Sequence, residues 1–255
     1  MLGTLLPGER QALLMISPHL MRVWAVVALS LCLAGCGKTE SYRYKLTLAV
    51  NTPEGVKRGS SVGEVVHWEV SIPERGIAHK LRGEALYLDL GPGKRPLIAL
   101  LTSKLHPHGE PAPWTRSGGP DSRFWLRLYG ETPSLDFLDD VVRITRLRGP
   151  RKITPEDLPD LVTFADINDP KTGIEIDPND LQATLGRGIT WNEITFESTN
   201  EPITSGIRTK LPWIEAYFQK NLRLDGQNLE FPKKDLANNL SWADFDLSGD
   251  LKRSR

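Results

Sequence analysis

The sequence predicts an α+β fold in which antiparallel strands come first and the helices come mostly later. Residues 42–50 alternate strictly between apolar and polar side chains, and this period of two is typical of a half-buried strand. After Tyr129 the apolar residues recur at helical spacing instead. We therefore expect antiparallel strands in the N-terminal half, with a few short helices and one or two further strands in the C-terminal half.

The alternating pattern returns several times before Tyr129. Residues 66–72 repeat it, and the polar segment 51–61 is expected to be a connection in which Pro53 and Gly55 suit a tight turn. Further strands are predicted at residues 84–90, 96–101 and 123–129. A hairpin turn of sequence GPGK at 91–94 is expected to join the first two of these.

The second half mixes helices with a strand. Thr132 suits the N-cap of a helix that ends at Gly149, and a second, short helix is expected to begin at Asp177 and end at Gly186. Residues 189–197 return to the strand pattern, and their inward set changes phase between Trp191 and Ile194, which indicates a β-bulge. A third helix is predicted at residues 211–219.

These elements are expected to form one α+β domain over residues 42–220, followed by a polar C-terminal tail, 221–255, that is loosely attached. Hydrophobic residues make up 39% of the 255 residues, which is well above the share in disordered chains. Lysine plus arginine and aspartate plus glutamate number 32 each. Such a balance lacks the basic bias of nucleic-acid-binding proteins, so no nucleic-acid partner is expected.

An apolar run of eleven residues, 23–33, follows Arg22 near the start of the chain. A membrane-spanning helix needs about 20 such residues, whereas the apolar region of a signal peptide needs about 7–15. We therefore interpret residues 1–35 as a signal peptide. Pro7 and Glu9 are poorly suited to its charged start, so Met21 is the expected natural first residue.

The end of this segment, Leu33-Ala34-Gly35-Cys36, resembles the lipobox of bacterial lipoproteins. The resemblance implies that the Cys36 sulfur receives a diacylglycerol and that cleavage then makes Cys36 the first residue, with 36–41 as a tether. Two or more acyl chains anchor a protein stably, whereas one chain does so marginally. The implied location is the bacterial cell envelope, at the outer membrane facing the periplasm if the cell is Gram-negative. An uncleaved anchor and a buried core helix are the alternatives.

The two cysteines of the chain, Cys32 and Cys36, both lie in this opening segment. The body must therefore be stable without disulfides, which its length permits. Its sequence at 42–62 and 201–213 resembles a family of uncharacterised bacterial proteins. That resemblance covers most of the body and implies no activity.

One motif raises the possibility of a hydrolase. Residues 59–63 read GSSVG and match G-x-S-x-G with Ser61 at the centre, and Asp89 and His106 follow in the order of a catalytic triad. A nucleophile elbow needs a strand before the serine and a helix after it, whereas here a polar turn precedes Ser61 and a strand pattern follows. We therefore expect Ser61 to begin a strand and to have no catalytic role.

Metal sites are the other candidates. His106 and His108 flank a proline and offer two imidazoles to zinc, whereas His67 is expected to point outward into solvent from its strand. Two acidic segments, 166–180 and 244–250, carry oxygen ligands of the kind calcium prefers. The first departs from an EF-hand at Pro170 and fits turns and helix caps better; the second lacks the glutamate that should close such a loop.

These observations predict a lipid-anchored envelope protein whose body is a binding or structural module. An envelope hydrolase or a calcium-binding protein is the alternative. Membrane attachment through Cys36 is the one site that the sequence assigns. No catalytic, cofactor-binding or metal-binding residue is assigned, and no cofactor is expected. No phosphate-binding glycine loop occurs, and the protein or small-molecule partner stays open.

Overall fold

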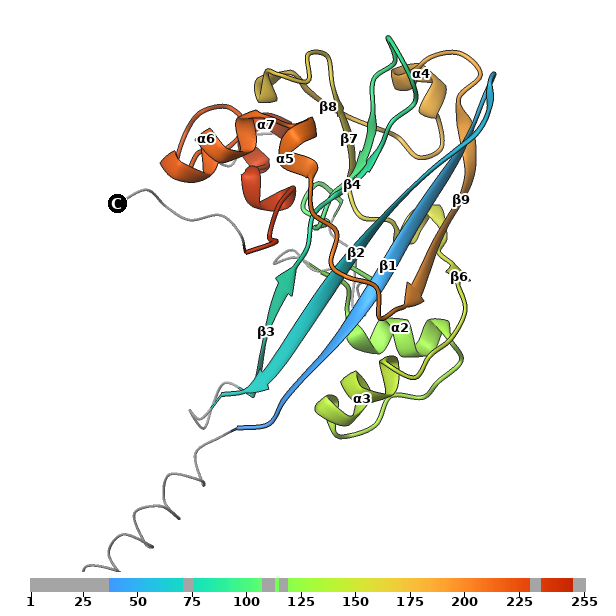
Figure 1. The fold of residues 1–255 in the computed structure, drawn as a ribbon, viewed down its shortest axis with the longest axis vertical. Coiled ribbons are helices and arrows are strands. Elements are labelled where there is room, and N and C mark those ends of the chain that lie inside the picture. Colours follow the sequence, from blue (N-terminus) through green and yellow to red (C-terminus); the bar gives the residue numbers. More distant parts are fainter. Residues whose placement is uncertain (1–36, 71–75, 107–112, 115–118, 230–234, 250–255) are drawn as a thin grey trace, which may run out of the picture. The chain divides into compact units, whose positions relative to one another are not determined.

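The computed structural model describes residues 37–70, 76–106, 113–114, 119–229 and 235–249. The fold is α+β, as the sequence predicts. It contains a five-stranded sheet with the strand order β3-β2-β1-β9-β6 and a four-stranded sheet with the order β4-β5-β7-β8. All the strand pairs are antiparallel. Figure 1 shows the long strands of the first sheet crossing the molecule, with the C-terminal helices at the upper left and the two helices from the middle of the chain at the lower right.

A long hairpin forms the centre of the first sheet. Strand β1, Thr39–Thr52, pairs with β2, Gly55–Glu69, along its whole length, and Pro53-Glu54 makes the two-residue turn. The polar segment 51–61, expected to be a connection, therefore belongs largely to β2. Packing requires Gly63 of β2, because it lies opposite Tyr44 and a Cβ there would lie 2.7 Å from the tyrosine oxygen. Tertiary pairing thus overrides the weak strand preference of this stretch.

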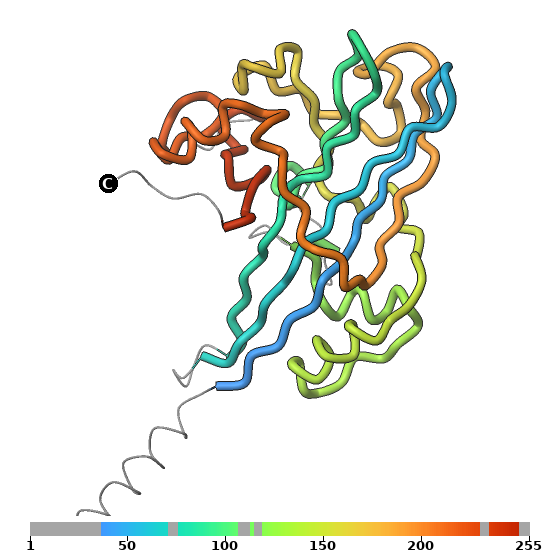
Figure 2. The backbone as a smooth tube through the Cα atoms, viewed as in Figure 1, coloured from blue at the N-terminus to red at the C-terminus, as the bar shows by residue number. Residues whose placement is uncertain are grey.

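The strands that flank this hairpin complete the first sheet. They are β3, Ile77–Arg82, β6, Arg151–Lys152, and β9, Thr190–Ser198. The bulge predicted in β9 is confirmed, because Ala49 pairs with Glu193 while Val50 pairs with Trp191, which leaves Asn192 as the extra residue. The tube in Figure 2 shows the segment after β9 running back across β2 to the C-terminal helices.

The second sheet contains β4, Leu86–Leu88, β5, Leu97–Ala99, β7, Leu161–Phe164, and β8, Gly173–Glu175. The hairpin predicted between β4 and β5 is confirmed. Both faces of this sheet are buried: Leu97 and Ala99 pack toward the first sheet, whereas Ile98 and Leu100 pack toward the C-terminal helices. A strand buried on both faces has a nearly continuous apolar sequence. For this reason β7 was not predicted from alternation of apolar and polar residues.

Helices α2, Ser122–Leu128, and α3, Phe137–Ile144, pack with the first sheet in the larger core cluster. The prediction of a strand at 123–129 was wrong. The buried residues Ser122, Trp125 and Leu126 stand three and four positions apart, which is helical spacing, and Asp121 caps the helix by accepting from the Phe124 amide. Helix α3 begins after Asp136 and not after Thr132, because the Asp136 carboxylate accepts from two amides of its first turn.

The remaining elements are short. They are η1, Pro155–Asp157, η2, Pro170–Thr172, α4, Leu181–Leu185, α5, Ile207–Lys210, α6, Trp213–Lys220, α7, Leu236–Asn239, and η3, Trp242–Asp244. Helix α6 confirms the prediction at 211–219, and Gly186 ends α4 with a positive φ. Helix α4 begins after Asp180, whereas Asp177 was expected to cap it. Asp177 accepts instead from the Asn179 amide in a turn.

The segment beyond Asn221 was expected to be loosely attached, and this expectation was wrong for its described residues. Leu224, Leu240 and Phe245 are fully buried in a second apolar cluster with the outer face of the four-stranded sheet. Asp246 pairs through its backbone with Glu84, two residues before β4. Polar residues separate these buried apolar residues in the sequence. The apolar residues are therefore too widely spaced to give a periodic signal.

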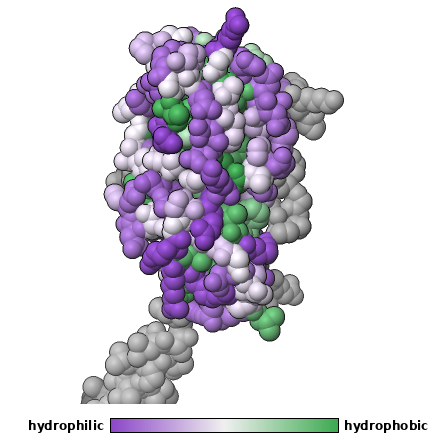
Figure 3. Space-filling model, turned by 90° about the vertical axis from the view of Figure 1, so that its right-hand side faces the viewer, coloured by the Kyte–Doolittle hydropathy of each residue, from purple (hydrophilic) through white to green (hydrophobic). Residues whose placement is uncertain are grey.

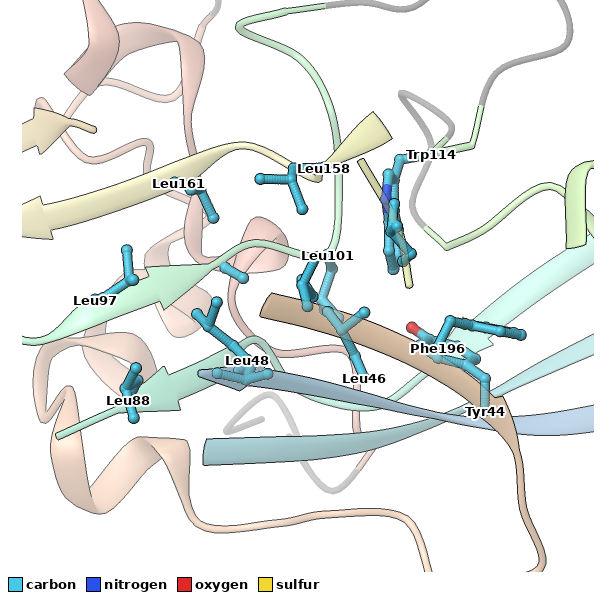
Figure 4. Close-up of a cluster of buried hydrophobic side chains, with 14 of the residues drawn as sticks. Tyr44, Leu46, Leu48, Leu88, Leu97, Leu101, Trp114, Leu158, Leu161 and Phe196 are labelled. Atoms are coloured by element: carbon cyan, nitrogen blue, oxygen red, sulfur yellow. The ribbon is translucent and has the colours of Figure 1, made fainter. Parts of the chain in front are cut away.

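The larger apolar cluster fills the space between the two sheets. Figure 4 shows Leu46 and Leu48 of β1 facing Leu88, Leu97 and Leu101, with the aromatic rings of Tyr44, Phe196 and Trp114 beyond them. Figure 3 shows one outer face, on which polar residues predominate and apolar ones form small patches. The body described thus buries its apolar side chains internally, and no helix among its described residues is long and apolar enough to cross a bilayer.

Candidate functional site

A cleft of about 670 Å³ opens beside the four-stranded sheet. Its walls come from the end of β8, the turn after it, the segment that leads into β7, and the turn that ends at His106. Polar lining comes from His106, Glu156, Asp160, Glu175, Asp177 and Asn179. Four of these six side chains are carboxylates, so the cleft is acidic.

Asp160 organises one wall of this cleft. Its side chain is buried, and its carboxylate accepts hydrogen bonds from the backbone amides of Lys104 at 2.6 Å, Leu105 at 2.9 Å and His106 at 3.2 Å. Burial raises the pKa of Asp160, while these three amides act in the opposite direction. Asp160 therefore holds the 104–106 turn in place and positions His106 at the cleft.

The imidazole of His106 lies between two carboxylates. Its Nε2 is 3.1 Å from a carboxylate oxygen of Glu175, which is hydrogen-bond distance, and its Nδ1 is 3.8 Å from Asp160. The side chain is 72% exposed, so it remains open to a ligand from solution. No serine, threonine, cysteine or lysine occurs among the described residues that line the cleft. The carboxylates and the imidazole can hold a positively charged group by hydrogen bonds and charge.

The sequence singled out His106 as a zinc candidate beside His108, and Glu175, Asp177 and Asn179 lie in the acidic segment 166–180 that it named as a calcium candidate. His108 lies outside the described residues. Asp160 and Glu156 were not identified from the sequence. A signal for Asp160 exists in hindsight, because it immediately precedes the apolar run of β7, where an acidic residue must be buried and must find amide partners.

Two of the three triad candidates, Ser61 and Asp89, have structural roles, whereas His106 lies at the cleft. Ser61 lies within β2, which continues on both sides of it, so the strand–turn–helix geometry of a nucleophile elbow does not form. Its hydroxyl is buried and donates to the backbone oxygen of Glu84 at 2.7 Å. Ser61 was expected at the start of a strand and is found in the interior of one. Asp89 accepts from the Gly91 amide in the β4–β5 turn.

The acidic segment 166–180 forms turns and caps. The carboxylates of Asp166, Asp169, Asp177 and Asp180 each accept from a backbone amide two or three positions ahead. These local bonds are the ones that aspartate typically forms in turns and at helix starts. Among the described residues no group of three or more His, Cys, Asp or Glu side chains gathers as a metal-binding set.

The second acidic segment, 244–250, is tied to the protein's own cations. Asp244 is buried and forms an ion pair of 2.8 Å with Lys104, and Asp246 is buried and forms one of 2.8 Å with Arg208. Ser248 receives a hydrogen bond from Arg208. The side chains that a calcium loop would supply thus bind protein donors, while Asp250 lies outside the described residues.

The lipobox cysteine, Cys36, also lies outside the described residues. Comparison with known proteins adds no relative: no protein-family model, no curated protein and no solved structure matches this chain. Function must therefore be argued from the chain's own residues.

Proposed function

We propose that this protein is a lipoprotein of the bacterial cell envelope, anchored through Cys36, whose α+β body is a binding module. The observation that carries the anchoring is the sequence Leu33-Ala34-Gly35-Cys36 after an apolar run of eleven residues. A run of that length suits a signal peptide and is too short for a comfortable membrane span. The sulfur of Cys36 carries diacylglycerol in this proposal, and its amine is the mature N-terminus.

Two properties of the body are compatible with a lipid anchor at Cys36. Its sequence after Cys36 contains no cysteine, so folding needs no oxidation step. Strand β1 begins at Thr39, which shortens the expected tether from residues 36–41 to 36–38. Three residue steps separate Cys36 from Thr39 and span at most about 11 Å. The lipid anchor thus holds the start of β1 close to the headgroups.

The binding role is assigned to the acidic cleft. Asp160, Glu175 and Asp177 surround a space large enough for a small molecule, and His106 stands at its edge. Carboxylates that line a concave site attract cations and disfavour anions. The ligand class that this chemistry recognises is a small organic molecule or peptide end that carries an amine or guanidinium group.

The anchoring is tested by lipid labelling in a bacterial host. Cys36→Ser should abolish incorporation of a labelled fatty acid and leave the precursor uncleaved. Cys32→Ser, which lies four positions earlier in the apolar run, is the matched control and should change neither result. A mature chain that begins elsewhere by intact mass, or a Cys36 thiol that can still be alkylated, would contradict the proposal.

The cleft is tested separately with the full chain in detergent. A diamine such as 1,4-diaminobutane should shift the NMR signals of the His106 imidazole and the Leu105 amide. Glu175→Gln should weaken that response, whereas Glu215→Gln, on helix α6, should not. An equal response in both variants, or none in the parent protein, would show that the cleft does not recognise amines.

A further inference from the structure

Two histidines stand directly opposite each other on neighbouring strands, away from the acidic cleft. His67 of β2 pairs with His79 of β3 in the antiparallel register. Such partners have Cβ atoms about 4.5–5.5 Å apart on the same face of a sheet. The two ring centres are 5.9 Å apart and the planes are tilted by 37°.

This spacing fits two imidazoles that share one metal ion. A zinc–nitrogen bond is about 2.0–2.1 Å long, and the ring centre lies about 1.1 Å beyond the nitrogen, so two ligating rings are about 5 Å apart at a tetrahedral angle and about 6.4 Å apart when opposed. The observed 5.9 Å lies between these values. The distance between the rings is therefore compatible with one ion between them.

His67 was expected to point into solvent, and this expectation was wrong. Its side chain lies on the inner face with Val65, because Val65 pairs with Tyr42 and so shares the face on which the core forms. The residue is 5% exposed, and its Nδ1 is buried without a hydrogen-bond partner among the described residues. A buried polar atom in that condition costs about 1–3 kcal/mol and calls for an explanation.

The histidine ring is held in a fixed orientation. Tyr42 stacks near it with planes 15° apart and centres 6.2 Å apart, and Phe137 lies 5.0 Å away at 58°. Burial is the main factor that lowers the pKa of His67, to about 4, and the neighbouring His79 adds to it.

The space beside the two rings can admit an ion. A cavity of about 320 Å³ is lined by His67 and His79 together with Asp121, Ser122 and Arg123. The guanidinium of Arg123 would repel a cation, but it is engaged by the buried carboxylate of Asp140 at 3.3 Å. Asp121, on the same cavity wall, supplies a negative charge.

We propose that His67 and His79 bind a divalent late first-row metal ion such as Zn²⁺, with water or an external ligand in the other coordination positions. Imidazole nitrogen is a preferred ligand for Zn²⁺, Ni²⁺ and Cu²⁺, whereas Ca²⁺ and Mg²⁺ prefer oxygen. The chain provides two ligands from rigid, paired strands, which leaves the ion open to exchange. This site is independent of the acidic cleft and of the lipid anchor.

The test uses the full chain in detergent with Cys32→Ser and Cys36→Ser, so that thiols do not compete for the ion. Zn²⁺ is titrated at pH 7.5 against a chromophoric chelator. One ion should bind per chain, and His79→Gln should weaken its affinity by at least about tenfold, since even loss of an outer-shell partner costs about 10–100-fold. His67→Phe, which keeps a ring in the core, should have the same effect.

The matched control is the double variant His106→Gln with His108→Gln, which removes the other histidine pair and should leave the affinity unchanged. His79 is exposed, so the His79→Gln variant should fold. This variant keeps the test decisive if the His67→Phe variant does not fold. Absence of binding in the parent protein would overturn the proposal. So would an unchanged affinity in His79→Gln, or a loss confined to the control.

Discussion

Trp125 of helix α2 and Phe196 of strand β9 stack face to face, with ring centres 3.7 Å apart and planes within 4° of parallel. Both side chains are fully buried. The contact joins two elements that are distant in the sequence. It therefore contributes to the tertiary structure and not to the local structure of either element. Tyr44 stacks on the Phe196 ring at 5.6 Å, and Trp114 meets Trp125 edge-on, which makes this pair the centre of an aromatic cluster.

The pair allows a sharp stability prediction. Trp125→Ala should lower the free energy of unfolding by roughly 3–5 kcal/mol, because it leaves a large cavity. Trp125→Phe should cost much less, since it keeps a ring against Phe196 and removes an indole N–H that has no partner among the described residues. Urea unfolding checks both. Leu135→Ala, at a fully exposed position, should change stability by less than about 0.5 kcal/mol.

A second prediction concerns the attachment of the C-terminal segment. Asp246 accepts from Arg208 at 2.8 Å, and its carboxylate is 1% exposed. Asp246→Ala should cost about 1.5–3 kcal/mol, the range for a hydrogen bond with charged partners. Limited proteolysis should then cut first between residues 221 and 249. Cleavage that begins elsewhere, at an unchanged stability, would show that this contact does not hold the segment.

A third prediction follows from Glu84, whose carboxylate accepts from the Ile207 amide at 2.8 Å. Burial is the main factor that raises the pKa of Glu84 above its ordinary value, and Asp246 adds to it. The folded state therefore holds this proton more tightly than the unfolded state, so its contribution to stability is present at low pH and is lost as pH rises through the raised pKa.

Glu84→Gln removes this titration and keeps an oxygen acceptor for Ile207. The stability of this variant relative to the parent protein should therefore improve as the pH rises to 7 from about 4, the ordinary pKa of a glutamate side chain. The difference between the two urea midpoints across this range measures the effect. Glu215→Gln serves as the control, and a difference that is constant with pH would contradict the assignment.

A fourth prediction concerns Ser61. Activity-based serine-hydrolase probes should leave the protein unlabelled, because the hydroxyl is buried and donates to Glu84. Ser61→Ala should cost about 1 kcal/mol of stability from the lost hydrogen bond. Labelling that disappears in Ser61→Ala would restore the hydrolase hypothesis.

Local patterns in the sequence were sufficient for several elements. The alternation at 42–50, the turn between β4 and β5, the bulge in β9 and the helix near 211–219 were all predicted and are confirmed. Each of these depends on the spacing of apolar residues along one stretch or on the chemistry of one turn. The sequence also determines the lipoprotein prediction, since Leu33 to Cys36 is a linear signal that needs no fold.

Tertiary structure decided what depends on partners distant in the chain. The alternating segment that contains His67 fits either face, and its pairing with β1 turned Val65 and His67 inward. Asp160 became a wall of the acidic cleft because the 104–106 amides meet it across 54–56 positions. No local sequence pattern predicts a contact between residues so far apart in the chain. Faces, registers and clefts arise from which strands pair, and that choice is made by burial of the whole core at once.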